Sequence, residues 1–178
     1  YRGCGKHSLV ARVLASLETD GVPAFDVAHL SGSAHAEAAP AMRELVRQLA
    51  APGTERRASR YVDDLALVSD ELGRRRAEGG APLLVVLSQL ECFALQQRQT
   101  LLYVLLDAVQ SKLGCIVVLG ITTDRNVLEL FEKRVRSRLH NNRVTFGHAA
   151  LDDVLAMLDD RLRLDDSDYG KAFAAAWT

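Results

Sequence analysis

The chain has 178 residues, of which 48% are hydrophobic and 25% charged, and its formal net charge is −1. This is the composition of a globular domain with a buried core, and the near-zero charge excludes a general attraction to DNA or to an anionic membrane. No apolar run approaches the roughly 20 residues that a membrane-spanning helix needs. The three cysteines form no CxxC pair, which argues against a disulfide framework or a zinc site and fits a reducing cytosolic or nuclear compartment.

Apolar residues recur with alternating helical and strand patterns along the whole chain. In chain order the patterns predict helix 6–18, strand 24–30, helix 34–50, helix 61–78, strand 83–87, helix 97–112, strand 115–121, helix 125–139, strand 143–146 and helix 151–163, with a last short helix through Trp177. This alternation predicts a parallel sheet covered by helices on both faces. In such folds ligands bind at the carboxyl ends of the strands.

A short glycine-containing motif, Arg2-Gly3-Cys4-Gly5-Lys6, stands directly before the first predicted helix. Glycines let backbone N–H groups wrap phosphate oxygens, and a lysine adds positive charge near the β- and γ-phosphates. The motif matches the second half of a phosphate-binding loop, whose usual preceding strand is not in the sequence. We therefore interpret the chain as a fragment truncated at both ends. An incidental glycine turn before a helix is the alternative.

The positions that would complete a hydrolytic site carry unsuitable side chains. His7 stands where a working loop places a hydroxyl on Mg²⁺, and imidazole is a poor ligand for that ion. Ser88 and Gln89 follow strand 83–87, where Asp and Glu would hold the metal and polarise the attacking water. Thr123, after strand 115–121, is placed to contact the γ-phosphate or that water, or only to cap a turn. Hydrolysis is therefore expected to be very slow or absent.

A basic run occupies the second half of predicted helix 125–139. On a helix, Arg134 and Arg138 are four residues apart and share a face. Such a run is most often a solvated face. The alternative is an arginine finger, a planar and always charged group offered across a subunit boundary to the nucleotide of a partner.

Taken together, these segments resemble the subunit 4 family of the eukaryotic origin recognition complex, which belongs to the AAA+ replication initiators. The resemblance is carried by residues 2–6, 87–94, 99–103, 119–123 and 128–138, and more loosely by 173–177. It implies an α/β AAA+ P-loop fold of three α-β-α layers, with a five-stranded parallel sheet whose first strand is missing from the fragment. It places a truncated AAA+ ATPase-like domain at 1–147 and the beginning of a helical lid at 148–178.

The resemblance also implies a set of site residues. Nucleotide would be bound by Arg2, Gly3, Cys4, Gly5, Lys6, His7 and Thr123. The chain's own site would have no catalytic residue, since Ser88 and Gln89 depart from the family pattern, and no metal site. ATP is the expected cofactor, and a firmly held Mg²⁺ is not expected.

The implied partners are other subunits of the complex, especially subunit 1, and origin DNA in the nucleus, with no membrane. In this family Arg138 matches the arginine finger that reaches the ATP of subunit 1, and Arg134 is a candidate second contact. The expected function is replication initiation as a DNA-binding complex subunit that binds ATP weakly without hydrolysing it. Two alternatives stay open: an active P-loop ATPase with unusual ligands, and an α/β module whose residues 3–6 bind nothing.

Overall fold

The computed structural model describes residues 3–19, 25–50, 60–111, 115–139, 142–147 and 149–162. The chain divides into a larger compact unit, Arg2–Val144, and a smaller one that includes Thr145–Thr178. The smaller unit contains α8 (Leu151–Leu162). No helix within the described ranges has both the length and the apolar character that crossing a bilayer requires.

A parallel three-stranded sheet lies at the centre of the larger unit. Its strands are β1 (Asp26–Ser31), β2 (Leu83–Ser88) and β3 (Ile116–Ile121), in the order β1-β2-β3. The central strand β2 is a continuous apolar run through Leu87, as expected where both neighbours and the faces shield a strand from water. The register pairs Ser31 with Ser88 and Ser88 with Ile121, so the three carboxyl ends meet at one edge.

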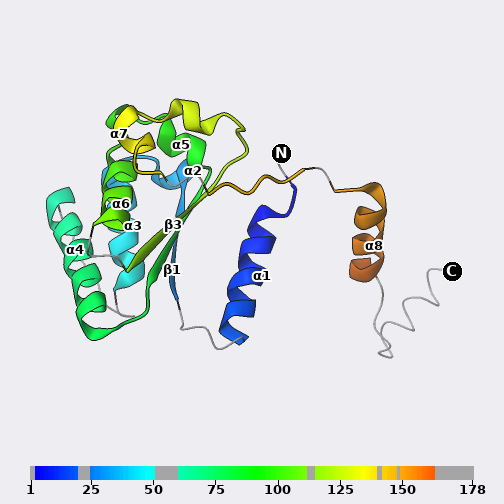
Figure 1. Cartoon of the computed structure of the whole chain (residues 1–178), viewed down its shortest axis with the longest axis horizontal. Helices are drawn as coiled ribbons and strands as arrows, with labels where there is room; N and C mark the ends of the chain where they lie inside the picture. The colour runs from blue at the N-terminus through cyan, green and yellow to red at the C-terminus, as the bar shows by residue number, and fades with distance from the viewer. Residues whose placement is uncertain are drawn as a thin grey trace. The chain divides into compact units, whose positions relative to one another are not determined.

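Three helices cover one face of this sheet: α3 (Ala38–Leu49), α4 (Tyr61–Glu78) and α6 (Thr100–Gln110) (Figure 1). The core between them contains Leu45, Leu72 and Leu105, each at most 2% exposed. Burying a leucine side chain contributes roughly 1.5–3 kcal/mol, so this layer holds the unit together. The first helix, α1 (Lys6–Thr19), adds no side chain to the core cluster of the described residues, and its Leu9 is 44% exposed.

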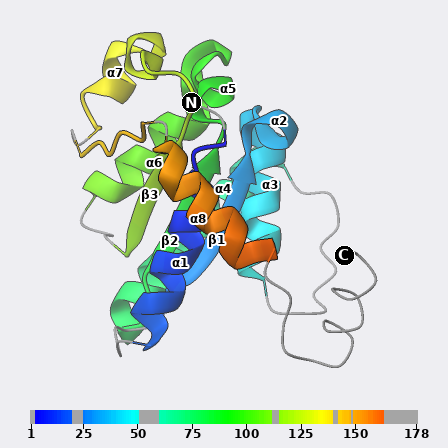
Figure 2. The ribbon, with the colours of Figure 1, turned by 90° about the vertical axis from the view of Figure 1, so that its right-hand side faces the viewer.

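Short elements follow each strand at its carboxyl end. They are α2 (Gly32–His35) after β1, α5 (Leu90–Ala94) and η1 (Gln97–Gln99) after β2, and η2 (Val127–Leu130) and α7 (Lys133–Arg136) after β3. Figure 2 shows α2, α5 and α7 gathered beyond one end of the strands. Gly32 permits the close approach of α2, because a Cβ there would lie 2.4 Å from the carbonyl oxygen of Gln89.

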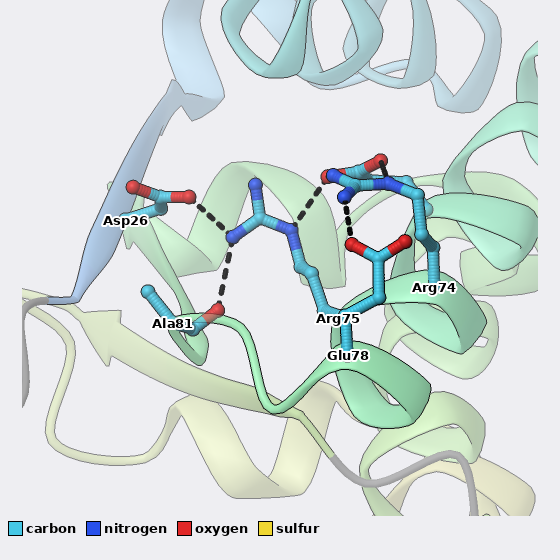
Figure 3. Close-up of polar contacts among 6 residues, drawn as sticks. Asp26, Arg74, Arg75, Glu78 and Ala81 are labelled. Atoms are coloured by element: carbon cyan, nitrogen blue, oxygen red, sulfur yellow. Dashed lines mark hydrogen bonds and ion pairs between the residues drawn. The ribbon is translucent and has the colours of Figure 1, made fainter.

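The opposite, amino end of the sheet is fixed by the buried arginine Arg75 of α4 (Figure 3). Its Nε donates to Glu71 Oε1 at 2.8 Å, and its Nη1 donates to the carbonyl of Ala81 at 3.0 Å and to the carboxylate of Asp26. Hydrogen bonding from Arg74 is the main cause that lowers the pKa of Glu71, so this carboxylate remains charged beside the buried guanidinium. The network ties α4 to the start of β1 and to the segment that enters β2.

The open edge of β1 is covered by a side chain of α3. The His29 N–H donates to Gln48 Oε1 at 2.8 Å, and Gln48 Nε2 donates back to the His29 carbonyl at 2.8 Å. This amide makes the two bonds that a further strand would make, and so blocks the strand addition to which exposed edges are prone.

Two predicted elements are wrong in this part of the chain. The continuous helix 125–139 is instead η2, an extended step at Phe131 and Glu132, and the short helix α7. Val127, Phe131 and Val135 are buried at four-residue spacing, although no single helix carries all three. The helix is interrupted because the Glu132 N–H is bound by a side chain, Gln99 Oε1 at 2.9 Å, rather than by a helical carbonyl.

The predicted strand 143–146 is also absent, since described residues 142–147 form no regular element. Val144 there is 80% exposed and no described strand pairs with it, whereas a strand needs a hydrogen-bonding neighbour. The described sheet accordingly has three of the four strands that were predicted for this chain.

Predicted helix 34–50 is divided into α2 and α3, and predicted helix 97–112 begins as η1 before α6. The second division follows from positive φ values at Arg98 and Gln99, which no α-helix accommodates. The short helix α5 was not predicted, and the other described helices and strands agree with the predictions to within two residues at each described end. The last predicted helix, through Trp177, lies outside the described residues.

Candidate functional site

The glycine motif forms a tight loop at the start of α1. Gly3 and Gly5 have φ values of +74° and +73°, which residues with a Cβ rarely adopt. The Leu9 N–H donates to the Gly5 carbonyl at 2.8 Å, so the helix begins directly after the loop. The loop therefore presents the N-terminus of a 14-residue helix, the arrangement that favours phosphate binding. Arg2 lies outside the described residues.

Two side chains that replace magnesium ligands are bonded directly to each other. His7 Nε2 and Ser88 Oγ are 3.0 Å apart and share a hydrogen bond. These are the positions at which a working P-loop site places a hydroxyl and a carboxylate on Mg²⁺. Neither group carries a negative charge, and the bond closes the space between them. No cluster of metal-binding side chains occurs within the described ranges.

The side chain of Gln89 is bonded to the end of β1 and the start of α2. Its backbone is left-handed, with φ +58°, and its side-chain Oε1 accepts hydrogen bonds from Ser31 Oγ at 3.1 Å and from the Ser33 N–H at 2.9 Å. The amide oxygen is thus used to hold the end of β1 and the start of α2. It is not available to orient water as the glutamate of a hydrolytic site would.

Glu91 binds both threonines that follow β3. Thr122 Oγ1 donates to Glu91 Oε2 at 2.6 Å, and Thr123 Oγ1 donates to Glu91 Oε1 at 3.0 Å. Burial raises the pKa of Glu91, but its hydrogen bonds, with Thr122 the strongest, outweigh burial and lower the pKa overall. A hydroxyl has a single proton, so Thr123 in this arrangement has none to donate to a phosphate oxygen. Its role as a nucleotide contact stays a prediction.

The two candidate finger arginines gather around one aromatic ring on α6. The guanidinium carbons of Arg138 and Arg134 lie 4.3 Å and 5.2 Å from the ring centroid of Tyr103. Such cation–π contacts contribute about 0.5–1 kcal/mol at exposed sites. The two arginines lie over the same ring, but they do not share a face of one helix as predicted, because α7 ends at Arg136 and Arg138 lies in the turn after it.

Arg138 is oriented by three hydrogen bonds to described residues. Nε donates to Asp107 Oδ1 at 3.0 Å, Nη2 to Tyr103 Oη at 3.0 Å, and Nη1 to the Arg134 carbonyl at 2.9 Å. Its side chain is still 23% exposed. Arg134 pairs with Glu132 and donates to the carbonyl of Arg98. Both guanidinium groups are therefore held in defined orientations at the surface.

No protein-family model matches the chain. Origin recognition complex subunit 4 of Rattus norvegicus is 29% identical over 181 residues, which cover 99% of this chain and 42% of that protein. Origin of replication complex subunit 4 of Oryza sativa subsp. japonica is 31% identical over 161 residues, which cover 89% of this chain and 34% of that protein. The chain is similar to origin recognition complex subunit 4 proteins along nearly its whole length. It spans about two fifths of the length of the rat protein and about one third of the rice protein.

Solved structures agree with this relationship at the level of fold. Cdc6p from Pyrobaculum aerophilum superposes with a TM-score of 0.69 at 23% identity, covering 89% of this chain and 40% of that one. The Aeropyrum pernix Orc1 protein, solved in complex with DNA, gives a TM-score of 0.69 at 17% identity, over 89% and 41% of the two chains. The predicted α/β AAA+ fold class and the predicted resemblance to subunit 4 of the origin recognition complex are both confirmed.

Sequence reasoning missed the side chains that orient the arginines. Tyr103 and Gln99 belong to a segment that carried the resemblance, but neither had an assigned role. The available signal was a tyrosine within the apolar run of α6 and a glutamine at its start, where a polar side chain needs a partner if it is buried. Asp107 gave no comparable signal, because an exposed acid on a helix is common.

Proposed function

We propose that this chain is the AAA+ part of an origin recognition complex subunit that acts in replication initiation without hydrolysing ATP at its own site. The similarity to subunit 4 relatives along 99% of the chain supports membership of such a complex. The observation that carries the loss of hydrolysis is the direct bond between His7 and Ser88. It joins the two positions between which Mg²⁺ would lie, and neither residue supplies the hard anionic oxygen that this ion prefers.

The same site keeps features that favour weak ATP binding. The loop with positive φ at Gly3 and Gly5 still leads into the N-terminus of α1, and Lys6 opens that helix. An ATP titration of the full-length protein with and without Mg²⁺ tests this. We expect Mg²⁺ to change the affinity by less than about twofold, because no acidic ligand stands at either metal position. Lys6→Ala should weaken binding, and magnesium-dependent turnover abolished by Lys6→Ala would instead establish the active ATPase.

The working group in this proposal is Arg138, offered to the ATP of a neighbouring AAA+ subunit, namely subunit 1. An arginine finger must stay charged, be oriented and be reachable, and Arg138 is bonded in a fixed direction while remaining partly exposed. Arg134, over the same ring, is the second contact. The assembled complex would act in the nucleus and contact origin DNA mainly through its phosphates.

Substitution of Arg138 in the assembled complex tests this role. Arg138→Ala should lower the kcat of the neighbouring subunit for ATP hydrolysis by at least about tenfold, since a finger stabilises charge that develops in the transition state. The matched control is Arg136→Ala, which removes the same charge from an exposed position on α7. An unchanged rate for Arg138→Ala in an intact complex would overturn the proposal, and equal losses for both variants would indicate a general charge effect.

A further inference from the structure

The segment that carries the arginines cannot hold its own shape. α7 has only four residues, and its N-cap, Glu132, makes no side-chain capping bond. A single helical turn is unstable in isolation because nucleation costs more than its few hydrogen bonds return. The direction of both guanidinium groups therefore depends on what fixes the backbone on either side of α7.

The amino end of this segment is held by the buried amide of Gln99, which is 4% exposed. Its Oε1 accepts from the Glu132 N–H at 2.9 Å, and its Nε2 donates to the carbonyls of Leu130 at 2.7 Å and Ala94 at 2.5 Å. Every polar hydrogen of the amide and its oxygen are thus used on backbone groups. The bonds clamp the exit of η2 and the entry of α7 to the end of α5.

The strained backbone at Gln99 also supports its role in holding the amino end of the arginine segment. Arg98 and Gln99 have φ values of +64° and +40°, and this conformation persists in non-glycine residues only when the surroundings enforce it. It turns the Gln99 side chain inward. At the same residue pair, the Arg98 carbonyl accepts from Arg134.

The carboxyl end of the segment is held by a second glutamine. Gln110 is the last residue of α6, and its Nε2 donates to the Arg138 carbonyl at 3.2 Å. Gln99 is the N-cap of the same helix. Side chains at the two ends of α6 therefore bind the backbone at Glu132 and at Arg138. They fix the seven-residue segment from Glu132 to Arg138 along the helix.

We infer that Gln99 and Gln110 are positioning residues for Arg138, acting through the backbone rather than through the guanidinium. This rests on the proposed role of Arg138 as a finger. With both amides in place the arginine segment can neither slide along α6 nor rotate about its own axis. A finger works only within a narrow geometry, and a displacement of 1 Å can cost about 100-fold in rate.

The test compares Gln99→Leu and Gln110→Leu with Gln97→Leu, in the full-length protein assembled with its neighbouring subunit. Gln97 is exposed in the same 3₁₀ turn and is the matched control. Each variant is made alone and together with Arg138→Ala. The readouts are kcat and KM of the neighbour's ATPase, the melting temperature of the variant, and the stoichiometry of the complex.

We expect Gln99→Leu to lower kcat by about tenfold and Gln110→Leu by about threefold, with KM changed by less than about twofold, because only the transition-state contact is displaced. In the Arg138→Ala background neither glutamine change should lower kcat further. Gln110 is exposed, so Gln110→Leu decides the matter if Gln99→Leu prevents assembly.

Two results overturn this inference while leaving the proposed function intact. One is a normal kcat for the glutamine variants in complexes where Arg138→Ala is defective. The other is an equal loss of kcat in both backgrounds, which would mean that the glutamines act by another route. If Arg138→Ala itself leaves kcat unchanged, the proposed function fails, and this inference fails with it.

Discussion

Two regions of the chain are networks of polar side chains: the carboxyl edge of the sheet, and the arginine face, which we define as Arg134 and Arg138 packed over Tyr103 of α6. The hydrogen bonds of the two regions have different effects. At the edge, His7 is hydrogen-bonded to Ser88 and the amide oxygen of Gln89 accepts from Ser31, so these side chains bind one another. On the arginine face, the bonds orient guanidinium groups that stay charged and partly exposed. Whether a polar group can bind a further partner therefore depends on whether its polar atoms are already bonded within the chain.

The two regions also differ in how much stability is lost when one of their hydrogen bonds is broken. The edge groups are partly exposed or exposed, so water can replace a broken bond. The arginine face is built on Gln99, whose amide is buried and whose partners are backbone groups. Stability should therefore be sensitive to substitution beneath the arginines and tolerant of it at the edge. Four experiments test this contrast.

The largest expected effect is that of Gln99→Leu on stability. The change leaves three backbone groups of the buried clamp without their partner, and we expect the free energy of unfolding to fall by about 3 kcal/mol. Urea denaturation measures it. Gln89→Leu is the control at the edge and should cost under about 1 kcal/mol, since Ser31 and Ser33 can bond water instead. Equal losses for the two variants would remove the contrast.

Restoring oxygen ligands at the edge should restore a metal response. In the double variant His7→Thr with Ser88→Asp, Mg²⁺ should tighten ATP binding by about tenfold, or about 1.4 kcal/mol, because a hydroxyl and a carboxylate now face the metal position. Calorimetric titration of ATP with and without Mg²⁺ measures this. The same double variant with Lys6→Ala is the control and should lose the ATP signal. No magnesium response would mean that the edge is misshapen beyond these two side chains.

A smaller effect should accompany loss of the Glu91 charge. Burial acts against the charged form, but hydrogen bonds from Thr122 and Thr123 lower the pKa of Glu91 below its ordinary value of 4.5. Because the folded-state pKa is depressed, the contribution to stability is present above about pH 4.5 and is lost as the pH falls through the folded value. Glu91→Gln should therefore cost about 1 kcal/mol at pH 7, and this cost should shrink on acidification. Urea melts of both proteins at pH 7 and below pH 4 measure it, and a cost independent of pH would contradict the assignment.

The smallest effect is expected for the exposed ion pair on the arginine face. Asp107 is 52% exposed, and such pairs contribute little because water and salt screen them. Asp107→Ala should change the free energy of unfolding by about 0.5 kcal/mol or less at physiological salt. A loss above about 1 kcal/mol in the same urea assay would show that Asp107 supports the fold as Gln99 does.

The fold class and the three strands of the described sheet were predictable from the pattern of residues alone. The continuous apolar runs of β2 and β3 and the helical periodicity of α4 survive in the structure, because in these segments the spacing of the apolar side chains matches the element that buries them. That the residues at the carboxyl edge of the sheet do not suit ATP hydrolysis was also predicted from their chemistry alone. No conformation of His7 supplies the hydroxyl expected at its position, and no conformation of Ser88 or Gln89 supplies a carboxylate.

The hydrogen bonds that these side chains make depend on the folded chain and could not be predicted from the sequence. The interrupted helix before Arg134, the left-handed turn at Gln99 and the unpaired segment 142–147 all depend on partners that are distant in the sequence or absent from the described sheet. A helical pattern cannot reveal that a glutamine more than thirty residues away has taken the N–H of Glu132. A backbone N–H or carbonyl bonds to whichever polar group the fold brings near. Here those groups are Gln99 and Gln110, and their bonds fix the segment that carries Arg138.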